Sequence, residues 1–219
     1  MKFAIIVFPG SNCDYDAYYV MKKHLQVSVK FVWHQNSDLS NYDCIIIPGG
    51  FSYGDYLRAG AIARFSKIMQ AIKLESEKGK PIIGICNGFQ ILVESGLLPG
   101  ALITNESTRF ISRQISLKVS NNNALFTKNY NKNEIINMRI AHKQGKYFAD
   151  KKLLKILKDN NQIAFRYTNN PNGSCDDIAG IFNDKKNILG MMPHPERASE
   201  GLLGSKEGVK IFESIVSSF

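Results

Sequence analysis

Short apolar runs alternate with amphipathic stretches between residues 1 and 100. The apolar runs, each ended by glycine or polar residues, predict four strands at residues 2–8, 27–33, 43–47 and 81–85. Two helices are predicted between them, because apolar residues recur there every three or four positions. The helical positions are Ala17, Met21 and Leu25, with Ser11-Asn12 as the cap, and then Ile62, Phe65, Met69 and Ile72. Alternating strands and helices predict an α/β fold with an open, mostly parallel, doubly wound sheet and flanking helices.

Beyond Gly100 the pattern changes to longer strands joined by polar, asparagine-rich segments. Strands are predicted at residues 109–119, 134–140, 162–167, 177–182 and 187–192. Some of these should be added to the sheet as antiparallel strands. Leucines at 153, 154 and 157 predict a short helix, and Val209, Phe212, Val216 and Phe219 predict a last one. Because no repeat and no long linker interrupts the pattern, residues 1–219 are predicted to form a single domain.

Composition narrows the range of functions. Apolar residues make up 44% of the chain, which is ordinary for a globular protein. The apolar run at the amino terminus is too short for a signal peptide or a membrane span, so we expect a cytoplasmic protein without a membrane partner. The net charge is +9, but the basic residues are dispersed and accompany no nucleic-acid motif. We therefore predict no nucleic-acid partner.

The four cysteines are scattered along the chain and form no C-x-x-C pair. They are Cys13, Cys44, Cys86 and Cys175. Without a secretory signal, free thiols are the better interpretation, and no metal site is predicted.

One of these thiols stands at the end of a predicted strand. The apolar run at 81–85 leads into Cys86, with Gly84 and Gly88 on either side. Small neighbours allow the sharp strand-to-helix turn known as the nucleophile elbow, here with cysteine in place of serine. A thiol at the amino end of a helix gains from the helix dipole, which favours the nucleophilic thiolate. Most free cysteines are simply small buried residues, so this stretch alone leaves both interpretations open.

A histidine and a glutamate follow another apolar strand. Prolines on both sides of His194 fix its backbone, and Glu196 is close enough to accept the imidazole N–H and set its tautomer. In isolation, a turn histidine and a solvated carboxylate would be the better interpretation. Together with Cys86, they favour a Cys–His–Glu triad in which the thiolate attacks a carbonyl carbon and His194 moves the proton.

A glycine-rich turn, Gly49-Gly50, follows the third predicted strand. Backbone N–H groups at such a turn can point into a site, and one of them could pair with the N–H of Asn87 as an oxyanion hole. Phosphate binding is the rival use of a glycine-rich turn. The chain has no G-x-x-x-x-G-K-[ST] pattern, which argues against the usual nucleotide site.

These motifs together resemble the class I (triad) glutamine amidotransferases. The residues that carry the resemblance are Gly84 to Gln90, Pro193-His194-Pro195-Glu196 and the Gly49-Gly50 turn. More narrowly, residues 48–63, residues 9–14 and Ile140-Ala141-His142 are similar to the family of glutaminase subunits of phosphoribosylformylglycinamidine synthase, so the similarity spans nearly the whole chain. That family takes part in an ATP-dependent amidation in purine biosynthesis.

The resemblance implies that L-glutamine binds as a thioester on Cys86 and releases ammonia and then glutamate. It also implies that Gly50 and Asn87 supply the oxyanion donors and that Gln90 helps to hold the substrate. Two further residues stay ambiguous. His142 either lines the pocket or is structural, and Phe51 either contacts the substrate or only packs.

Partners follow from the same resemblance. No part of the chain looks like an ATP-using synthetase, so no cofactor is expected here, and ATP and Mg²⁺ are expected in a partner. The family pairs with a large synthetase subunit and a small bridging subunit. One departure stands out, because Lys143-Gln144 replaces the usual Gly-Glu after His142. Its role at the pocket rim or at a partner surface stays open.

Two other functions are compatible with parts of the pattern. A cysteine hydrolase of the related peptidase-like branch is disfavoured by Gln90 and by the Pro-His-Pro-Glu order. A scaffold with an inert pocket is disfavoured because Cys86, His194 and Glu196 are all intact.

Overall fold

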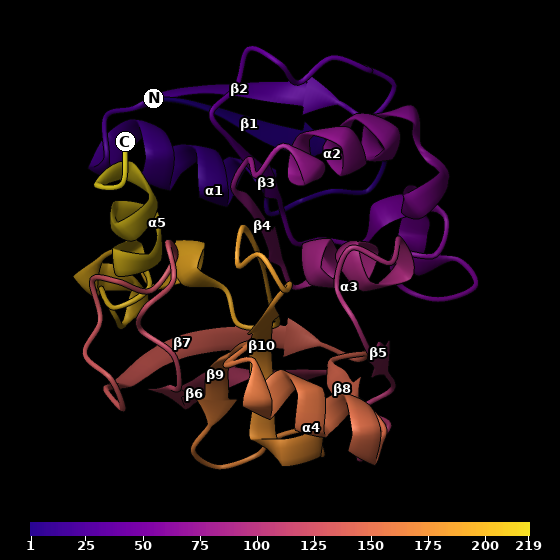
Figure 1. The fold of residues 1–219 in the computed structure, drawn as a ribbon, viewed down its shortest axis with the longest axis vertical. Coiled ribbons are helices and arrows are strands. Elements are labelled where there is room, and N and C mark those ends of the chain that lie inside the picture. Colours follow the sequence, from indigo (N-terminus) through magenta and orange to yellow (C-terminus); the bar gives the residue numbers. More distant parts are fainter.

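The computed structural model describes residues 1–219, and a nine-stranded sheet runs through it (Figure 1). The strand order is β2-β1-β3-β4-β11-β10-β9-β6-β7. The strands are β1 (Lys2–Val7), β2 (Ser28–Trp33), β3 (Cys44–Ile47), β4 (Ile82–Ile85), β6 (Ile111–Val119), β7 (Ile135–His142), β9 (Ile163–Tyr167), β10 (Ile178–Phe182) and β11 (Ile188–Met191). A separate two-stranded sheet pairs β5 (Ala101–Ile103) with β8 (Lys146–Phe148).

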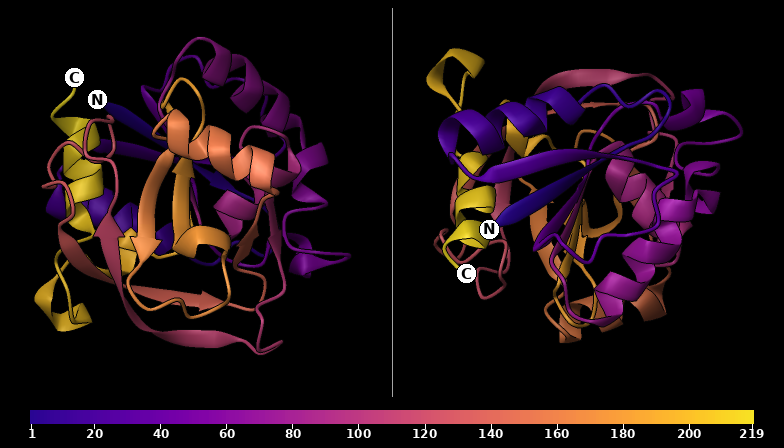
Figure 2. Two further views of the ribbon diagram at one scale, coloured as in Figure 1. Left: turned by 60° about the horizontal axis from the view of Figure 1, so that its bottom comes forward. Right: turned by 90° about the horizontal axis from the view of Figure 1, so that it is seen from above.

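Five helices accompany the sheet. They are α1 (Asp14–Tyr19), which continues as a π-helical turn at Val20–His24, α2 (Lys67–Glu77), α3 (Asn87–Glu94), α4 (Lys151–Asp159) and α5 (Val209–Val216). Single 3₁₀ turns occur at Ser52–Asp55, Ala63–Phe65, Cys175–Asp177, Pro195–Arg197 and Gly201–Leu203. Helices α1 and α5 lie on one face of the parallel strands, and α2 and α3 lie on the other (Figures 1 and 2). None of the helices combines the length and the apolar character that crossing a bilayer requires.

Strand β11 joins two kinds of sheet. From β2 to β11 all neighbouring strands are parallel, and from β11 to β7 each pair is antiparallel. β11 pairs with β4 so that Gly190 lies beside Gly84 and Met191 beside Ile85. The chain therefore leaves both strands at the same edge of the sheet, at neighbouring positions. The fold class predicted from the sequence is confirmed, including the added antiparallel strands.

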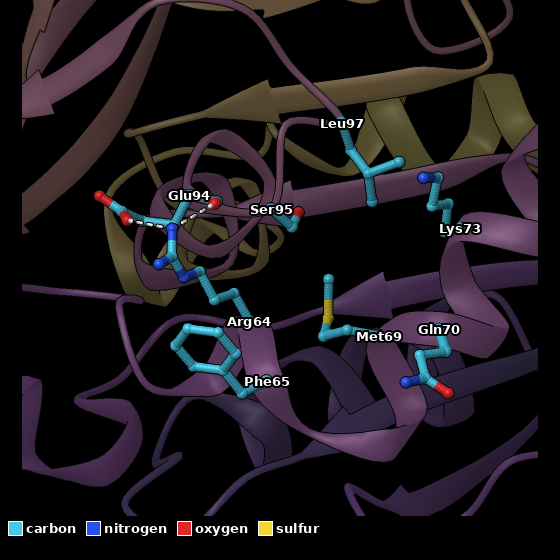
Figure 3. A pocket seen from close by; sticks show the side chains of 8 residues that line it. All are labelled: Arg64, Phe65, Met69, Gln70, Lys73, Glu94, Ser95 and Leu97. Carbon is cyan, nitrogen blue, oxygen red and sulfur yellow. Dashed lines mark hydrogen bonds and ion pairs between the residues drawn. The ribbon is translucent and has the colours of Figure 1, made fainter.

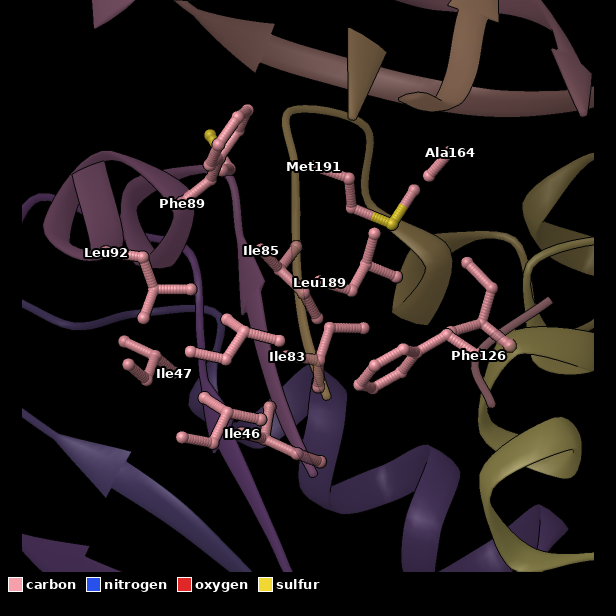
Figure 4. Close-up of a cluster of buried hydrophobic side chains, with 14 of the residues drawn as sticks. Ile46, Ile47, Ile83, Ile85, Phe89, Leu92, Phe126, Ala164, Leu189 and Met191 are labelled. Carbon is pink, nitrogen blue, oxygen red and sulfur yellow. The ribbon is translucent and has the colours of Figure 1, made fainter. Parts of the chain in front are cut away.

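The core lies on both faces of the central strands. Every residue of β3 and β4 is buried, as expected for parallel strands covered on both sides. Phe89 and Leu92 of α3 pack on one side of this layer, and Phe126 packs on the other (Figure 4). Each such side chain contributes about 1.5–3 kcal/mol by its removal from water. This packing fixes the strand ends on which the site is built.

Three local predictions were wrong. The helix expected from Ile62 begins only at Lys67, because the extended backbone of Ser66 interrupts it and leaves Phe65 75% exposed. The residue that caps α1 is Cys13 rather than Ser11-Asn12, since the Ser11 hydroxyl instead accepts a hydrogen bond from the Phe8 N–H. The last helix ends at Val216, so Phe219 lies beyond it and is exposed.

Candidate active site

Cys86 occupies a sharp turn between β4 and α3. Its backbone angles are φ 50° and ψ −104°, a conformation that residues with a side chain rarely adopt. The Cys86 N–H donates to the carbonyl of Met191 at 2.8 Å, and its own carbonyl accepts from the Gln90 N–H at 3.1 Å. A side chain at Gly88 would collide with the carbonyl oxygen of Ile47. The elbow expected from the sequence is therefore present, and the close approach of α3 to β3 requires the glycine.

The residues after β11 place His194 opposite this turn. The His194 N–H donates to the carbonyl of Arg139 in β7 at 2.8 Å, which holds the segment against the antiparallel strands. His194 Nδ1 lies 2.5 Å from Glu196 Oε1, and the two side chains are only 2% and 1% exposed. Burial disfavours the charged imidazole, but the negative charges of Glu196 and Cys86 outweigh it. The pKa of His194 is therefore held well above its ordinary value.

A small pocket of about 160 Å³ brings Cys86 and His194 together. Its wall is made by residues from six separate parts of the chain, which are Asn12, Cys13, Gly50, Phe51, Cys86, Phe110, Ala141, His194 and Arg197. The Cys86 thiol is nearly buried and donates a weak hydrogen bond to the Ala141 carbonyl at 3.6 Å. His194 Nε2 has no hydrogen-bond partner. The free ring nitrogen and the thiol therefore share one cavity, as proton transfer between them requires.

Two backbone donors lie beside this pocket. Neither the Gly50 N–H nor the Asn87 N–H donates a hydrogen bond within the chain. Gly50 has φ 136°, and a Cβ there would lie 2.7 Å from the backbone nitrogen of Asn12. The turn thus requires glycine for both its conformation and its space. The arrangement leaves both predicted oxyanion donors available.

The side chains of Asn87 and Gln90 are engaged inside the protein. Asn87 Oδ1 accepts from the Ser52 N–H at 3.0 Å, and Asn87 Nδ2 donates to Asp55 Oδ1 at 3.2 Å and to Gln90 Oε1 at 2.9 Å. Gln90 Nε2 donates to the carbonyl of Gln144 at 2.6 Å. These bonds connect the glycine-rich segment, residues 49–60, to α3 and to the loop after β7. Gln90 lies behind the pocket wall rather than in it.

The same network includes Gln144, which with Lys143 departs from the family's usual Gly-Glu. The side-chain carbonyl of Gln144 accepts a hydrogen bond from the Ala59 N–H at 3.0 Å. Gln144 therefore holds the end of the glycine-rich segment with its side chain, and holds Gln90 with its backbone.

His142, at the end of β7, is buried next to the pocket residue Ala141. Its Nδ1 pairs with Asn105 Oδ1 at 3.1 Å, and its Nε2 has no partner. Burial, reinforced by the positive charge of nearby His194, lowers the pKa of His142 to about 4. A neutral imidazole at this position supports the wall of the pocket without lining it.

Sequence reasoning missed five pocket residues, Asn12, Cys13, Phe110, Ala141 and Arg197. Asn12, Cys13 and Ala141 belong to segments that carried the family resemblance, and the Pro9-Gly10 turn marks the strand end after which Asn12 and Cys13 lie. Phe110 and Arg197 have no such signal, because an exposed aromatic and a lone arginine are common on any surface.

A second hollow lies at the other end of α3 (Figure 3). It is lined by Arg64, Phe65, Met69, Gln70, Lys73, Glu94, Ser95 and Leu97. Arg64 pairs there with Glu94 at 3.7 Å. Because α3 has eight residues and so spans about 12 Å, this hollow is separate from the pocket at Cys86.

Comparison with known proteins places these observations in a family. A model of the CobB/CobQ-like glutamine amidotransferase domain matches residues 1–210. The structure of PurLQS from Thermotoga maritima contains a chain that is 44% identical, with a TM-score of 0.91, and the match covers 99% of this chain and 98% of that one.

More distant structures share the fold. A glutamine amidotransferase from Thermotoga maritima is 13% identical with a TM-score of 0.65, and the match covers 99% of this chain and 96% of that one. The glutaminase domain of CTPS from Trypanosoma brucei, with bound acivicin, is 14% identical with a TM-score of 0.64. That match covers 99% of this chain and 94% of the other.

The chain belongs to the CobB/CobQ-like glutamine amidotransferases and is a glutamine amidotransferase enzyme. Within that class, its resemblance to the glutaminase subunit of phosphoribosylformylglycinamidine synthase is confirmed over nearly its full length.

Proposed function

We propose that Cys86, His194 and Glu196 hydrolyse L-glutamine to supply ammonia for the synthesis of phosphoribosylformylglycinamidine in purine biosynthesis. The observation that carries this assignment is the pocket shared by the Cys86 thiol and the free Nε2 of His194, with Glu196 bonded to the opposite ring nitrogen. We further propose that residues 1–219 act as one glutaminase domain in the cytoplasm.

The chemistry follows from these positions. The Cys86 thiolate attacks the side-chain amide carbon of glutamine, and its proton resides on His194. The carbonyl oxygen becomes an oxyanion that the N–H groups of Gly50 and Asn87 stabilise. His194 then gives its proton to the leaving nitrogen, so that ammonia departs and a thioester remains. The raised pKa of His194 favours the protonated ring that this step needs.

Hydrolysis of the thioester completes the cycle. Water attacks the same carbon while His194 accepts a proton from it, and the collapse of the oxyanion releases glutamate and the Cys86 thiolate. Glu196 keeps the ring in the orientation that presents Nε2 to the pocket. Phe51 flanks the substrate at the mouth, whereas Gln90 and His142 hold the wall from behind.

The ammonia serves a partner. We propose a large synthetase subunit that binds ATP and Mg²⁺, together with a small bridging subunit. Tyr56 and Leu57, which are 70% and 78% exposed in the segment next to the pocket, are apolar residues suited to such a contact.

A reconstituted complex tests the assignment. Cys86→Ser should abolish glutamine-dependent synthesis and leave ammonium-dependent synthesis intact, because the thiol is needed only to liberate ammonia. Cys175→Ser, which alters a half-exposed thiol outside the pocket, is the matched control. Loss of ammonium-dependent synthesis in Cys86→Ser would contradict the proposed division of labour.

A further inference from the structure

A second thiol stands in the pocket, and the glutaminase reaction does not use it. Cys13 follows the turn after β1 and is only 3% exposed. Arg197 Nη2 donates to Cys13 Sγ at 3.1 Å, and the thiol donates to Asn12 Oδ1 at 3.3 Å. Burial raises the pKa of this thiol on balance, although His194 and the guanidinium of Arg197 oppose the rise.

Cys13 lies close to the base of the proposed reaction. Its Sγ, a ring nitrogen of His194 and a carboxylate oxygen of Glu196 all lie within 4.8 Å of one another. Cys86 lines the same pocket, so two thiols flank one imidazole. The ring is almost completely buried, and its Nε2 has no partner. Two sulfurs and an unpaired ring nitrogen thus converge on one small cavity.

We propose that Cys13 Sγ, His194 Nε2 and Cys86 Sγ bind a thiophilic divalent cation of the Zn²⁺ type. Two thiolates and one neutral imidazole are a ligand set that zinc accepts, with water in the fourth position. Zinc binds sulfur at about 2.3 Å and histidine nitrogen at about 2.0–2.1 Å. Cys86 Sγ is not among the donor atoms that already lie within 4.8 Å of one another, so this side chain has to turn toward Cys13 Sγ and His194 Nε2 to complete the site. Binding releases the protons of the two thiols and, where the ring is charged, its Nε2 proton to solvent.

The surroundings fit a bound cation. Glu196 already pairs with His194 Nδ1, which is the outer contact that metal-bound histidines normally make. Two thiolates neutralise the charge of the ion, and Arg197 is already compensated by Asp16 at 3.0 Å.

Metal binding has a direct consequence for activity. The ion occupies Cys86 and His194 together, so it should inhibit glutamine hydrolysis reversibly and in competition with glutamine. This part rests on the proposed function, because it takes those two residues as nucleophile and base. The metal binding itself does not depend on the proposed function.

Binding is tested directly with Co²⁺, whose thiolate complexes absorb with an intensity that grows with the number of sulfur ligands. The wild-type chain should show a charge-transfer band for two thiolates, and Cys13→Ser and Cys86→Ser should each show about half of it. Cys175→Ser, which alters a thiol outside the pocket, should match the wild type. An unchanged band in folded Cys13→Ser and Cys13→Ala would overturn the site.

Inhibition is tested in the reconstituted complex at buffered Zn²⁺ concentrations, with each variant normalised to its own rate in chelator. Glutamine-dependent synthesis by the wild type should fall and recover on chelation, while ammonium-dependent synthesis persists. Cys13→Ser should need at least about tenfold more Zn²⁺ for half-inhibition. Equal sensitivity of Cys13→Ser and the wild type would overturn the proposal. If Cys86→Ser halves the Co²⁺ band yet still hydrolyses glutamine, the metal site stands and the assigned nucleophile is wrong.

Discussion

His194 Nδ1 and Glu196 Oε1 are 2.5 Å apart in a site that water hardly reaches. This contact fixes which ring nitrogen faces Cys86. Because members of a triad act as a unit, His194→Ala should lower glutaminase turnover about as much as removal of Cys86, by roughly 10³-fold or more. Glu196→Gln should cost less, since the amide oxygen can still accept the ring N–H.

Steady-state glutamate release by the complex checks this prediction, with ammonium-dependent synthesis as the control for assembly. Near-normal release by His194→Ala would show that another group is the base.

Gln144 should matter through its side-chain oxygen, which accepts from the Ala59 N–H. Gln144→Leu leaves that donor unpaired and should lower kcat/KM for glutamine by up to about tenfold, the range of one lost hydrogen bond. Gln144→Glu keeps an acceptor and should stay near the wild type. Kinetics of the two variants side by side distinguish the lost bond from a change of volume, and equal losses would argue against the bond.

Asp55 should make stability depend on pH. Burial raises the pKa of its carboxyl to about 6, although Asn87 opposes this by donating a hydrogen bond. The neutral form is favoured in the folded state, so its stabilising contribution is complete below the ordinary pKa and is lost as pH rises through about 6. Asp55→Asn should therefore be more stable than the wild type at pH 7.5, by about 1 kcal/mol after allowance for solvent.

Urea unfolding of both chains at pH 4 and pH 7.5 measures this difference, which should shrink at the lower pH. A constant difference would mean that the burial of Asp55 has no electrostatic consequence.

His142 should remain neutral in mildly acidic solution. Its pKa is lowered to about 4 by burial and by His194, so the ring should take up a proton only near that pH. The chain has four histidines, which makes NMR titration of each ring practicable. A midpoint for His142 near 6.5 would indicate an exposed ring and would contradict the packing seen at the end of β7.

Gly88 should tolerate no side chain. Gly88→Ala would drive a methyl group into the Ile47 carbonyl, so the elbow must shift and both activity and stability should fall. Gly201→Ala is the matched control, because the added carbon meets only the end of the Lys206 side chain at 3.5 Å. Thermal unfolding and glutamate release measure both effects. Wild-type behaviour of Gly88→Ala would show that α3 is less tightly packed on β3 than described.

The sequence was most informative where one physical cause dominates. Buried apolar runs such as Cys44–Ile47 become strands because both faces are covered, and the small residues around Cys86 allow one kind of turn. The helix start near Ile62 was mispredicted because the apolar spacing continues across Ser66, where the backbone is extended.

Long-range contacts were harder to predict from the sequence. The pairing of β5 with β8 joins two short strands far apart in the chain, and nothing local marks their register. Cys13 enters the pocket only because β1 and β3 end side by side, so a motif search centred on Cys86 gives it no role.

The pairing of β4 with β11 also determines when, during synthesis, the two sides of the pocket can meet. During synthesis the elbow emerges early, whereas its base arrives only after the antiparallel strands and β11 have left the ribosome. Until then the nascent chain holds the Cys86 thiol without the imidazole to which we assign its activation. On the proposed mechanism, the polypeptide acquires glutaminase competence late in translation, and half-made chains should not consume glutamine.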